Sequence, residues 1–186
     1  MNTKIMYVLL IWLVVHSNAF AGGKYKYEVQ EPNQLLVEVK GVVCSFCAYG
    51  TEKNLARLDF IDPNYFDGDG VFLDLENAAI TLALQADQKV NLDHVNRAIK
   101  KGGYDLVTVY LKLVGTVEKQ DKEFFIRNQW NGQLFGLLEK EGLPWKGDDY
   151  LGREVIIQGS ITRASLENQV SSIAQVVEIN KLETGQ

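Results

Sequence analysis

This chain is poor in the side chains that most often bind metals or perform catalysis. It has two cysteines, two histidines, two methionines and three prolines among its 186 residues. Both methionines and one histidine lie in the first 16 residues, so residues 22–186 offer Cys44, Cys47 and His94 as their only sulfur or imidazole ligands. A structural zinc centre takes four such ligands, and a Ser-His-Asp triad needs a suitably placed histidine. With no phosphate-binding loop either, we expect a protein that is not an enzyme.

The first 21 residues have the pattern of a secretory signal peptide. Lys4 precedes an apolar run at residues 5–15, and Ala19 and Ala21 supply the small residues of a signal-peptidase site. The run is shorter than the roughly 20 residues that a membrane span needs, and no later segment is apolar enough. We expect cleavage after Ala21, a periplasmic location and no membrane-embedded segment in the mature protein. An uncleaved N-terminal anchor is the alternative.

Negative charge outweighs positive charge along the chain. There are 24 Asp and Glu against 19 Lys and Arg, which gives a formal net charge of −5. A surface with this balance repels nucleic-acid phosphates and anionic lipids, so we expect neither as a partner. The aromatic residues after position 111 indicate core packing, because no basic groove that would bind a single strand accompanies them.

Residues 35–111 alternate between strand and helix patterns. Apolar residues recur at every second position in the strands and at every third or fourth position in the helices. The order is strand, helix, strand, strand, helix, strand. It predicts a ferredoxin-like βαββαβ domain with both helices on one face of an antiparallel sheet, after a lead segment at residues 22–34. The expected elements occupy residues 35–40, 47–58, 71–75, 80–84, 92–101 and 107–111.

Residues 112–186 lose this helical rhythm. Four or five strand-like segments, separated by Gly, Asn and Asp clusters, predict a small, mostly-β domain of the OB-like barrel type. A plain antiparallel sandwich is the alternative, and residues 134–140 have a helix-like pattern. No Pro-, Gly- or Ser-rich linker lies near residue 111, so we expect the fourth strand to run directly into this second domain. The predicted fold class is therefore α+β.

The chemistry of the chain is concentrated in the run Gly-Val-Val-Cys-Ser-Phe-Cys at residues 41–47. Cys44 precedes the first predicted helix and Cys47 lies in its first turn, where unpaired N–H groups and the helix dipole favour a thiolate. Two soft thiolates without further ligands suit an ion that accepts two-coordinate binding, Cu(I) first and Hg(II) second. The redox pair of a thiol–disulfide oxidoreductase and a structural disulfide are the alternatives.

Residues 35–111 resemble the heavy-metal-associated domain of copper chaperones, metal-pumping ATPases and the periplasmic mercury-binding protein. That family has the loop Gly-Met-x-Cys-x-x-Cys, which residues 41–47 match except at the methionine. Its second helix ends in Gly-Tyr or Gly-Phe, matched by Gly103 and Tyr104, and the hairpin at residues 71–84 has the family's rhythm. The resemblance does not extend to residues 113–186.

The resemblance implies that Cys44 and Cys47 bind the metal. It also implies that Gly41 and Val42 frame the loop and that Tyr104 lies beside the site. Val42 replaces the methionine that packs under the loop in the family, and it does so at smaller volume. Two further departures are an apolar Phe46 between the cysteines and a longer connection at residues 62–70.

Other polar residues have simpler interpretations. His94 falls off the apolar stripe of its helix, so we expect it to be solvated and do not expect a metal ligand there. The run at residues 67–70 lacks the spacing of a calcium loop and is expected to be a turn. Lys53 and Arg57 are expected on a solvated helix face. Neutralising a bis-thiolate site or meeting an acidic partner is the alternative role for these two cations.

These observations together predict an exported carrier that passes Cu(I) or Hg(II) to a partner by thiolate exchange. The expected partner is a membrane metal transporter or efflux component, with residues 112–186 either docking onto it or forming a homodimer. The alternatives are a periplasmic thiol–disulfide oxidoreductase and an adaptor whose cysteines form a structural disulfide.

Overall fold

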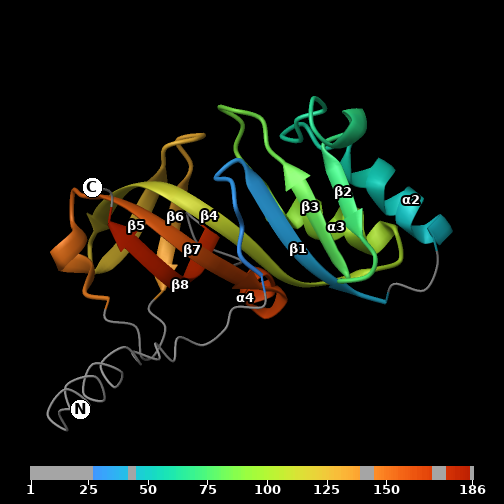
Figure 1. Cartoon of the computed structure of the whole chain (residues 1–186). Helices are drawn as coiled ribbons and strands as arrows, with labels where there is room; N and C mark the ends of the chain where they lie inside the picture. Colours follow the sequence, from blue (N-terminus) through green and yellow to red (C-terminus); the bar gives the residue numbers. More distant parts are fainter. Residues whose placement is uncertain (1–26, 42–44, 139–144, 169–174, 185–186) are drawn as a thin grey trace, which may run out of the picture.

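The structure is a computed structural model that describes residues 27–41, 45–138, 145–168 and 175–184 (Figure 1). Within these ranges the elements are β1 (Gln34–Lys40), α2 (Ser45–Leu55), η1 (Phe66–Gly68), β2 (Val71–Asp74), β3 (Ala79–Ala83), α3 (Leu92–Lys101), β4 (Asp105–Gln120), β5 (Glu123–Asn128), β6 (Leu134–Leu138), η2 (Gly147–Tyr150), β7 (Glu154–Thr162), α4 (Arg163–Asn168) and β8 (Gln175–Thr184).

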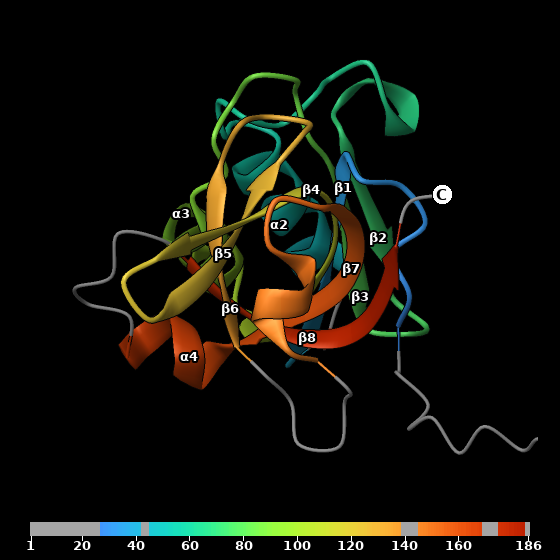
Figure 2. The same ribbon diagram turned by 90° about the vertical axis from the view of Figure 1, so that its left-hand side faces the viewer.

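The strands form one eight-stranded sheet with the order β2-β3-β1-β4-β5-β6-β8-β7. An additional pairing of β4 with β7 closes the last five strands into a barrel, which Figure 2 shows from its outer end. Neighbouring strands are antiparallel except for β6 and β8, which are parallel. The molecule therefore has an open part, built on β2, β3, β1 and the start of β4, and a closed barrel.

The predicted fold class, α+β with a ferredoxin-like βαββαβ domain followed by a separate OB-like barrel domain, is wrong as stated. The described chain is mostly β, with few helices and a closed five-stranded barrel. The physical reason is the 16-residue strand β4, which pairs with β1 in the open part and with β5 and β7 in the barrel. One sheet thus runs through both predicted units, and the predicted boundary between residues 111 and 112 falls inside β4. The absence of a linker at this point was predicted correctly.

In the open part, each strand turns its apolar residues toward the helices. Leu35, Val37 and Val39 of β1 are buried, while the residues between them are partly exposed. Helices α2 and α3 lie on the same face of β1, β2 and β3 (Figure 1). No helix in the described part of the chain is long and apolar enough to cross a membrane.

Helix α3 begins and ends where the sequence predicts. The side chain of Asn91 accepts hydrogen bonds from the backbone N–H groups of Asp93 (3.0 Å) and His94 (3.2 Å), as a typical N-cap does. At the other end, the N–H of Gly102 donates to the carbonyl oxygens of Ala98 and Ile99. Both termini are thus satisfied locally, which fixes the length of the helix.

The barrel is filled by apolar side chains from all five of its strands. Trp145 packs against this core: it is buried and stacks on Tyr150 with ring centroids 4.9 Å apart. Residues 134–140, which have a helix-like pattern, contain strand β6 instead. The buried residues inside the barrel include Leu113, Val117, Ile126, Phe135, Val155, Ile157, Val177 and Ile179.

Side chains from the β5–β6 connection join the barrel to the open part. Gln133 Oε1 accepts a hydrogen bond from the N–H of Val90 (2.8 Å), and its Nε2 donates to the Val90 carbonyl (3.0 Å). Trp130 Nε1 donates to the carbonyl of Gln85 (3.2 Å). The segment between β3 and α3 is therefore held against the barrel by backbone-directed hydrogen bonds as well as by the shared strand.

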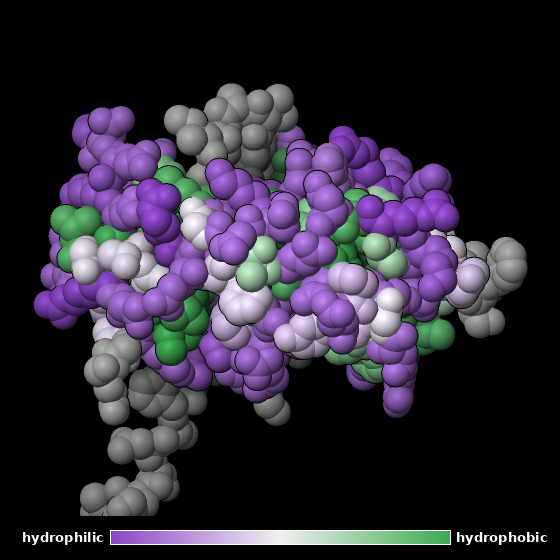
Figure 3. All heavy atoms as spheres, turned by 90° about the horizontal axis from the view of Figure 1, so that it is seen from above, coloured by the Kyte–Doolittle hydropathy of each residue, from purple (hydrophilic) through white to green (hydrophobic). Residues whose placement is uncertain are grey.

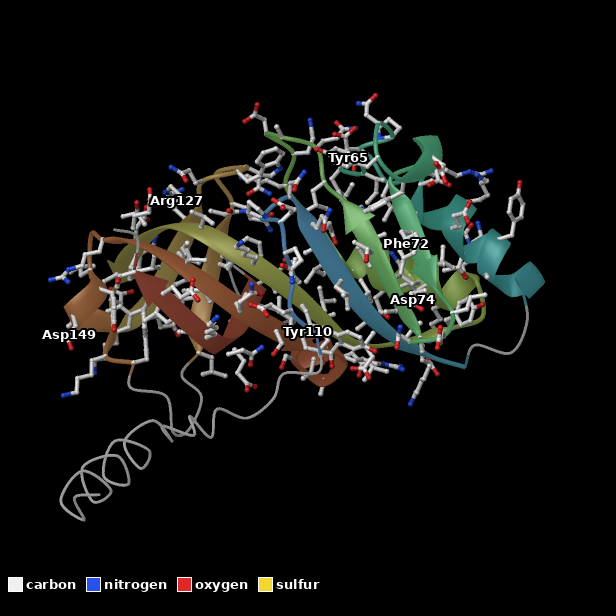
Figure 4. All side chains as sticks on the ribbon, in the orientation of Figure 1. Tyr65, Phe72, Asp74, Tyr110, Arg127 and Asp149 are labelled. Atoms are coloured by element: carbon white, nitrogen blue, oxygen red, sulfur yellow. The ribbon has the colours of Figure 1, made fainter. Side chains whose placement is uncertain are left out.

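The surface is largely hydrophilic. Figure 3 shows polar residues over most of the face seen from above, with apolar residues in separate patches. Figure 4 shows that two of the exposed aromatic residues, Tyr65 and Phe72, lie on the flank of the open part, away from the barrel. The large apolar side chains described as exposed are Tyr49, Tyr65, Phe72, Leu75, Leu138 and Leu151.

Candidate metal centre

The cysteine loop connects β1 to α2. β1 ends at Lys40 and α2 begins at Ser45, so Cys47 lies in the first turn of the helix, as the sequence predicts. Cys44 and Val42 fall outside the described residues. The first turn of α2 contains no acidic residue, so no carboxylate competes for its unpaired backbone N–H groups.

Two glycines hold the base of the loop against the start of β4. Gly41 has φ +88° and Gly103 has φ +91°, a left-handed conformation that favours glycine. A Cβ built on Gly41 would lie 3.6 Å from the carbonyl oxygen of Gly103, an ordinary van der Waals distance, so the two glycines are near neighbours. The register of β1 with β4, which pairs Lys40 with Asp105, brings them together. The loop therefore starts beside the α3–β4 connection.

Tyr104 follows this contact and is part of the core. Its side chain is 2% exposed, and its backbone N–H donates to the carbonyl of Ile99 (3.2 Å). The structure thus places two of the predicted neighbours of the site, Gly41 and Tyr104, at the same end of the sheet. This burial shows that Tyr104 packs in the core.

Helix α2 is held close to the end of α3. Thr51 is fully buried, and a Cβ added to Gly102 would overlap its Oγ1 and approach its Cβ to 2.7 Å. Only a glycine at position 102 permits this approach, although its φ of −79° is open to any residue. The contact sets where the first turn of α2 lies relative to the α3–β4 connection. The sequence alone identifies Gly102 as a helix terminator and gives no sign of its packing role.

Lys53 is engaged with acidic neighbours. Its Nζ lies 3.3 Å from Glu52 Oε1 and 3.4 Å from Asp69 Oδ2, and it stands 5.4 Å from the ring centre of Tyr49. Burial raises the pKa of Glu52, and a hydrogen bond with Asp69 raises it further. The hydrogen bond to Glu52 is the main cause that raises the pKa of Lys53. Lys53 therefore neutralises this carboxylate pair, which argues against a role in balancing two thiolates.

His94 lies away from the loop. It is in the first turn of α3, whereas Gly103 and the base of the loop lie beyond the last turn of that helix. Among the residues that the structure describes, no group of three or more His, Cys, Asp or Glu side chains could hold a metal ion. Asp69, in the run expected to be a turn, accepts a hydrogen bond from the N–H of Val71 (3.1 Å).

The chain was compared with protein families, curated proteins and solved structures. No protein family and no curated protein matches the chain. A solved structure named "CopZ metallochaperone" is 27% identical over the matched region, with a TM-score of 0.34. The match covers 40% of this chain and 98% of that one.

Proposed function

We propose that this protein is an exported soft-metal carrier that holds Cu(I) between the thiolates of Cys44 and Cys47, with Hg(II) as the second candidate. The position of helix α2 is the observation that supports this most. The helix starts one residue after Cys44 and includes Cys47 in its first turn. Backbone N–H groups that have no partner within the helix favour thiolates at these two positions.

The ligand supply favours a transferable ion over a permanent structural one. After residue 21 the chain has no methionine and one histidine, and that histidine lies at the far end of α3 from the loop. Two thiolates leave a Cu(I) ion open to a third ligand, whereas a structural zinc site is closed by four.

Transfer requires only ligand exchange. A thiolate of the partner bonds to the ion, which becomes three-coordinate, and the bond to one of the two cysteines breaks. A second partner thiolate then displaces the other cysteine. The ion keeps its oxidation state, no electron is transferred, and each cysteine released stays a thiolate or takes a proton from water. This is binding and exchange, so we propose no enzymatic turnover.

The surroundings of the loop support a preformed site. Gly41 and Gly103 meet at its base, and the contact between Thr51 and Gly102 holds α2 in place. A carrier benefits from such rigidity because less ordering is needed when the ion binds.

Location and partner follow from the chemistry proposed. With cleavage after Ala21 the protein would act in the periplasm, and the acceptor would be a membrane metal transporter or efflux component with exposed thiolates. The closed barrel would then serve as the part that docks or dimerises.

The decisive experiment is an anaerobic titration of the reduced mature protein with Cu(I) against a competing chelator, repeated with Hg(II). The Cys44→Ser/Cys47→Ser variant is the control. We expect one equivalent of Cu(I) to bind and the double variant to lose it. Metal binding that persists in the double variant, or no metal binding by the wild-type protein, would refute the proposed carrier function.

Two rival functions predict other outcomes in the same samples. A thiol–disulfide oxidoreductase would reduce insulin with the cysteine pair and would not need metal. A structural disulfide would resist mild reductants, and its removal would lower the thermal stability of the protein. A carrier loads after mild reduction and has no insulin-reducing activity.

A further inference from the structure

An open groove lies between α2 and α3. It has a volume of about 320 Å³ and is lined by residues from the end of α2, the segment after it and one face of α3. Leu58 and Ala98 supply its apolar surface, and Asn54 adds an amide. The groove shares no lining residue with the loop at residues 41–47.

Positive charge converges on this groove. Arg57 contributes from the segment after α2, and Arg97 and Lys101 contribute from α3, where they are four residues apart and so on one face. His94 lies one turn before Arg97 on the same face. No acidic residue lines the groove. In a chain with a net charge of −5, this is a local reversal of sign.

The three cations are not neutralised by the fold. Arg57, Arg97 and Lys101 are all exposed, and none makes an ion pair or side-chain hydrogen bond with another described residue. Lys53, one turn before Arg57, differs because Glu52 and Asp69 both contact it. Asp59 and Asp93 are near in sequence but lie outside the groove lining.

We propose that this groove binds a small oxyanion with two or more negative charges, of the phosphate or pyrophosphate class. Guanidinium groups bind phosphate and carboxylate oxygens through paired, charge-assisted hydrogen bonds, and an ammonium group adds a third contact. Two arginines from different elements with one lysine can surround such an anion from both walls of the groove. The site does not use the cysteines, so it is independent of the metal-carrier function.

Size and surroundings favour a small ligand over a protein partner. A volume of about 320 Å³ is at the lower end of the range for small-molecule pockets. Protein interfaces are centred on large apolar or aromatic anchors. The large apolar side chains described as exposed all lie on elements other than α3 and outside the groove lining.

The test is a titration of the whole metal-free protein with pyrophosphate at fixed ionic strength. Calorimetry measures the binding, and amide NMR shifts locate it. We expect saturable binding with shifts centred on α3. Arg97→Gln/Lys101→Gln should weaken it by about tenfold or more, since two charge-assisted contacts are lost. Lys100→Gln is the matched control, because Lys100 lies in the same turn but does not line the groove.

Three results would overturn the proposal. The first is an equal loss of affinity in the Lys100→Gln control, which would mean nonspecific attraction to the charged helix end. The second is an absence of saturation by pyrophosphate in the correctly folded wild-type protein. The third is tighter binding of a glutamate-rich peptide than of pyrophosphate, which would assign the groove to an acidic protein partner. Thermal unfolding of each variant verifies that it is folded.

Discussion

Strand β4 begins beside the cysteine loop and ends inside the barrel, and the surroundings of its two ends differ. At its start, the chain passes through Gly102 and Gly103, and Gly41 lies near Gly103. Further along the strand, Leu113 and Val117 are almost fully buried among apolar residues of the barrel. The candidate chemistry therefore lies where backbone conformation is unusual, and the barrel supplies rigid packing.

The two parts of the molecule are coupled through the strand that they share. Loops carry function best when a rigid scaffold positions them, and here the scaffold extends directly into the functional end. The shared strand and the hydrogen bonds of Gln133 to Val90 leave no flexible joint between the parts. We therefore expect a substitution that destabilises the barrel to destabilise the open part as well.

The largest expected effect comes from Ile126→Ala in the barrel. Ile126 is fully buried, and the cavity should cost about 2–5 kcal/mol of unfolding free energy. Because β4 is shared, the open part should unfold in the same transition. Tryptophan fluorescence, which reports on Trp130 and Trp145, monitors unfolding in urea. The result is compared with amide hydrogen exchange in α3. Loss of the fluorescence signal while α3 amides keep wild-type protection would show two independent units.

A smaller effect is expected from Gly102→Ala in the open part. The new methyl group would overlap Thr51, which should cost about 1–3 kcal/mol and displace α2, weakening Cu(I) retention. Gly50→Ala is the control and lies on α2, the helix that Gly102→Ala would displace; no atom lies within 4 Å of its added Cβ. This control should leave Cu(I) affinity unchanged and stabilise the helix by about 0.5–1 kcal/mol. Equal Cu(I) affinities for the two variants would show that the Thr51 contact does not position the site.

Removing the hydrogen bonds between Gln133 and Val90, which join the barrel to the open part, should lower the stability by a still smaller amount. Gln133→Ala removes both hydrogen bonds to Val90, and we expect a loss of about 1 kcal/mol of unfolding free energy. Amide exchange at residues 85–90 should rise. Gln129→Ala, which loses an exposed contact to Glu154, should change stability by less than about 0.5 kcal/mol. If the two variants behave alike, the shared strand alone couples the two parts.

Local features of the structure were predictable from the sequence. The cap at Asn91 and the glycines at 102 and 103 define α3, and the alternation in β1 identifies its buried face. The start of α2 at Ser45 puts Cys47 in a first turn, as expected. Each of these depends on residues within one or two turns of one another, which is the range over which spacing is informative.

Features that depend on distant partners were not predictable. The pairing of β4 with both β1 and β7 joins segments that a sequence pattern treats separately, so two domains were expected. The apolar run at residues 134–138 suits a short strand or a short helix, and its pairing with β5 and β8 decides for the strand. The packing of Gly102 against Thr51 and the groove beside Arg97 likewise arise only when α2 and α3 meet.

The smallest expected effect is on an exposed ion pair of the β4–β5 hairpin. Arg127 Nη2 donates to Glu118 Oε2 at 2.8 Å, and this hydrogen bonding is the main cause that lowers the pKa of Glu118. A lowered pKa in the folded state stabilises the protein above the ordinary glutamate pKa of about 4.3, and that stabilisation is lost as the pH falls through the lowered value.

Glu118→Gln should therefore lower the melting temperature slightly at pH 7, and the difference from wild type should disappear in acid. Melting curves from pH 7 to pH 2 measure it. In an Arg127→Gln background the same substitution should have no pH-dependent effect, because the hydrogen bond that lowers the pKa is already gone. A difference that persists at pH 2 would mean that Glu118 acts through packing on the barrel surface and not through its charge. The barrel would then owe none of its pH dependence to this pair, and the contrast with the open part would rest on apolar packing alone.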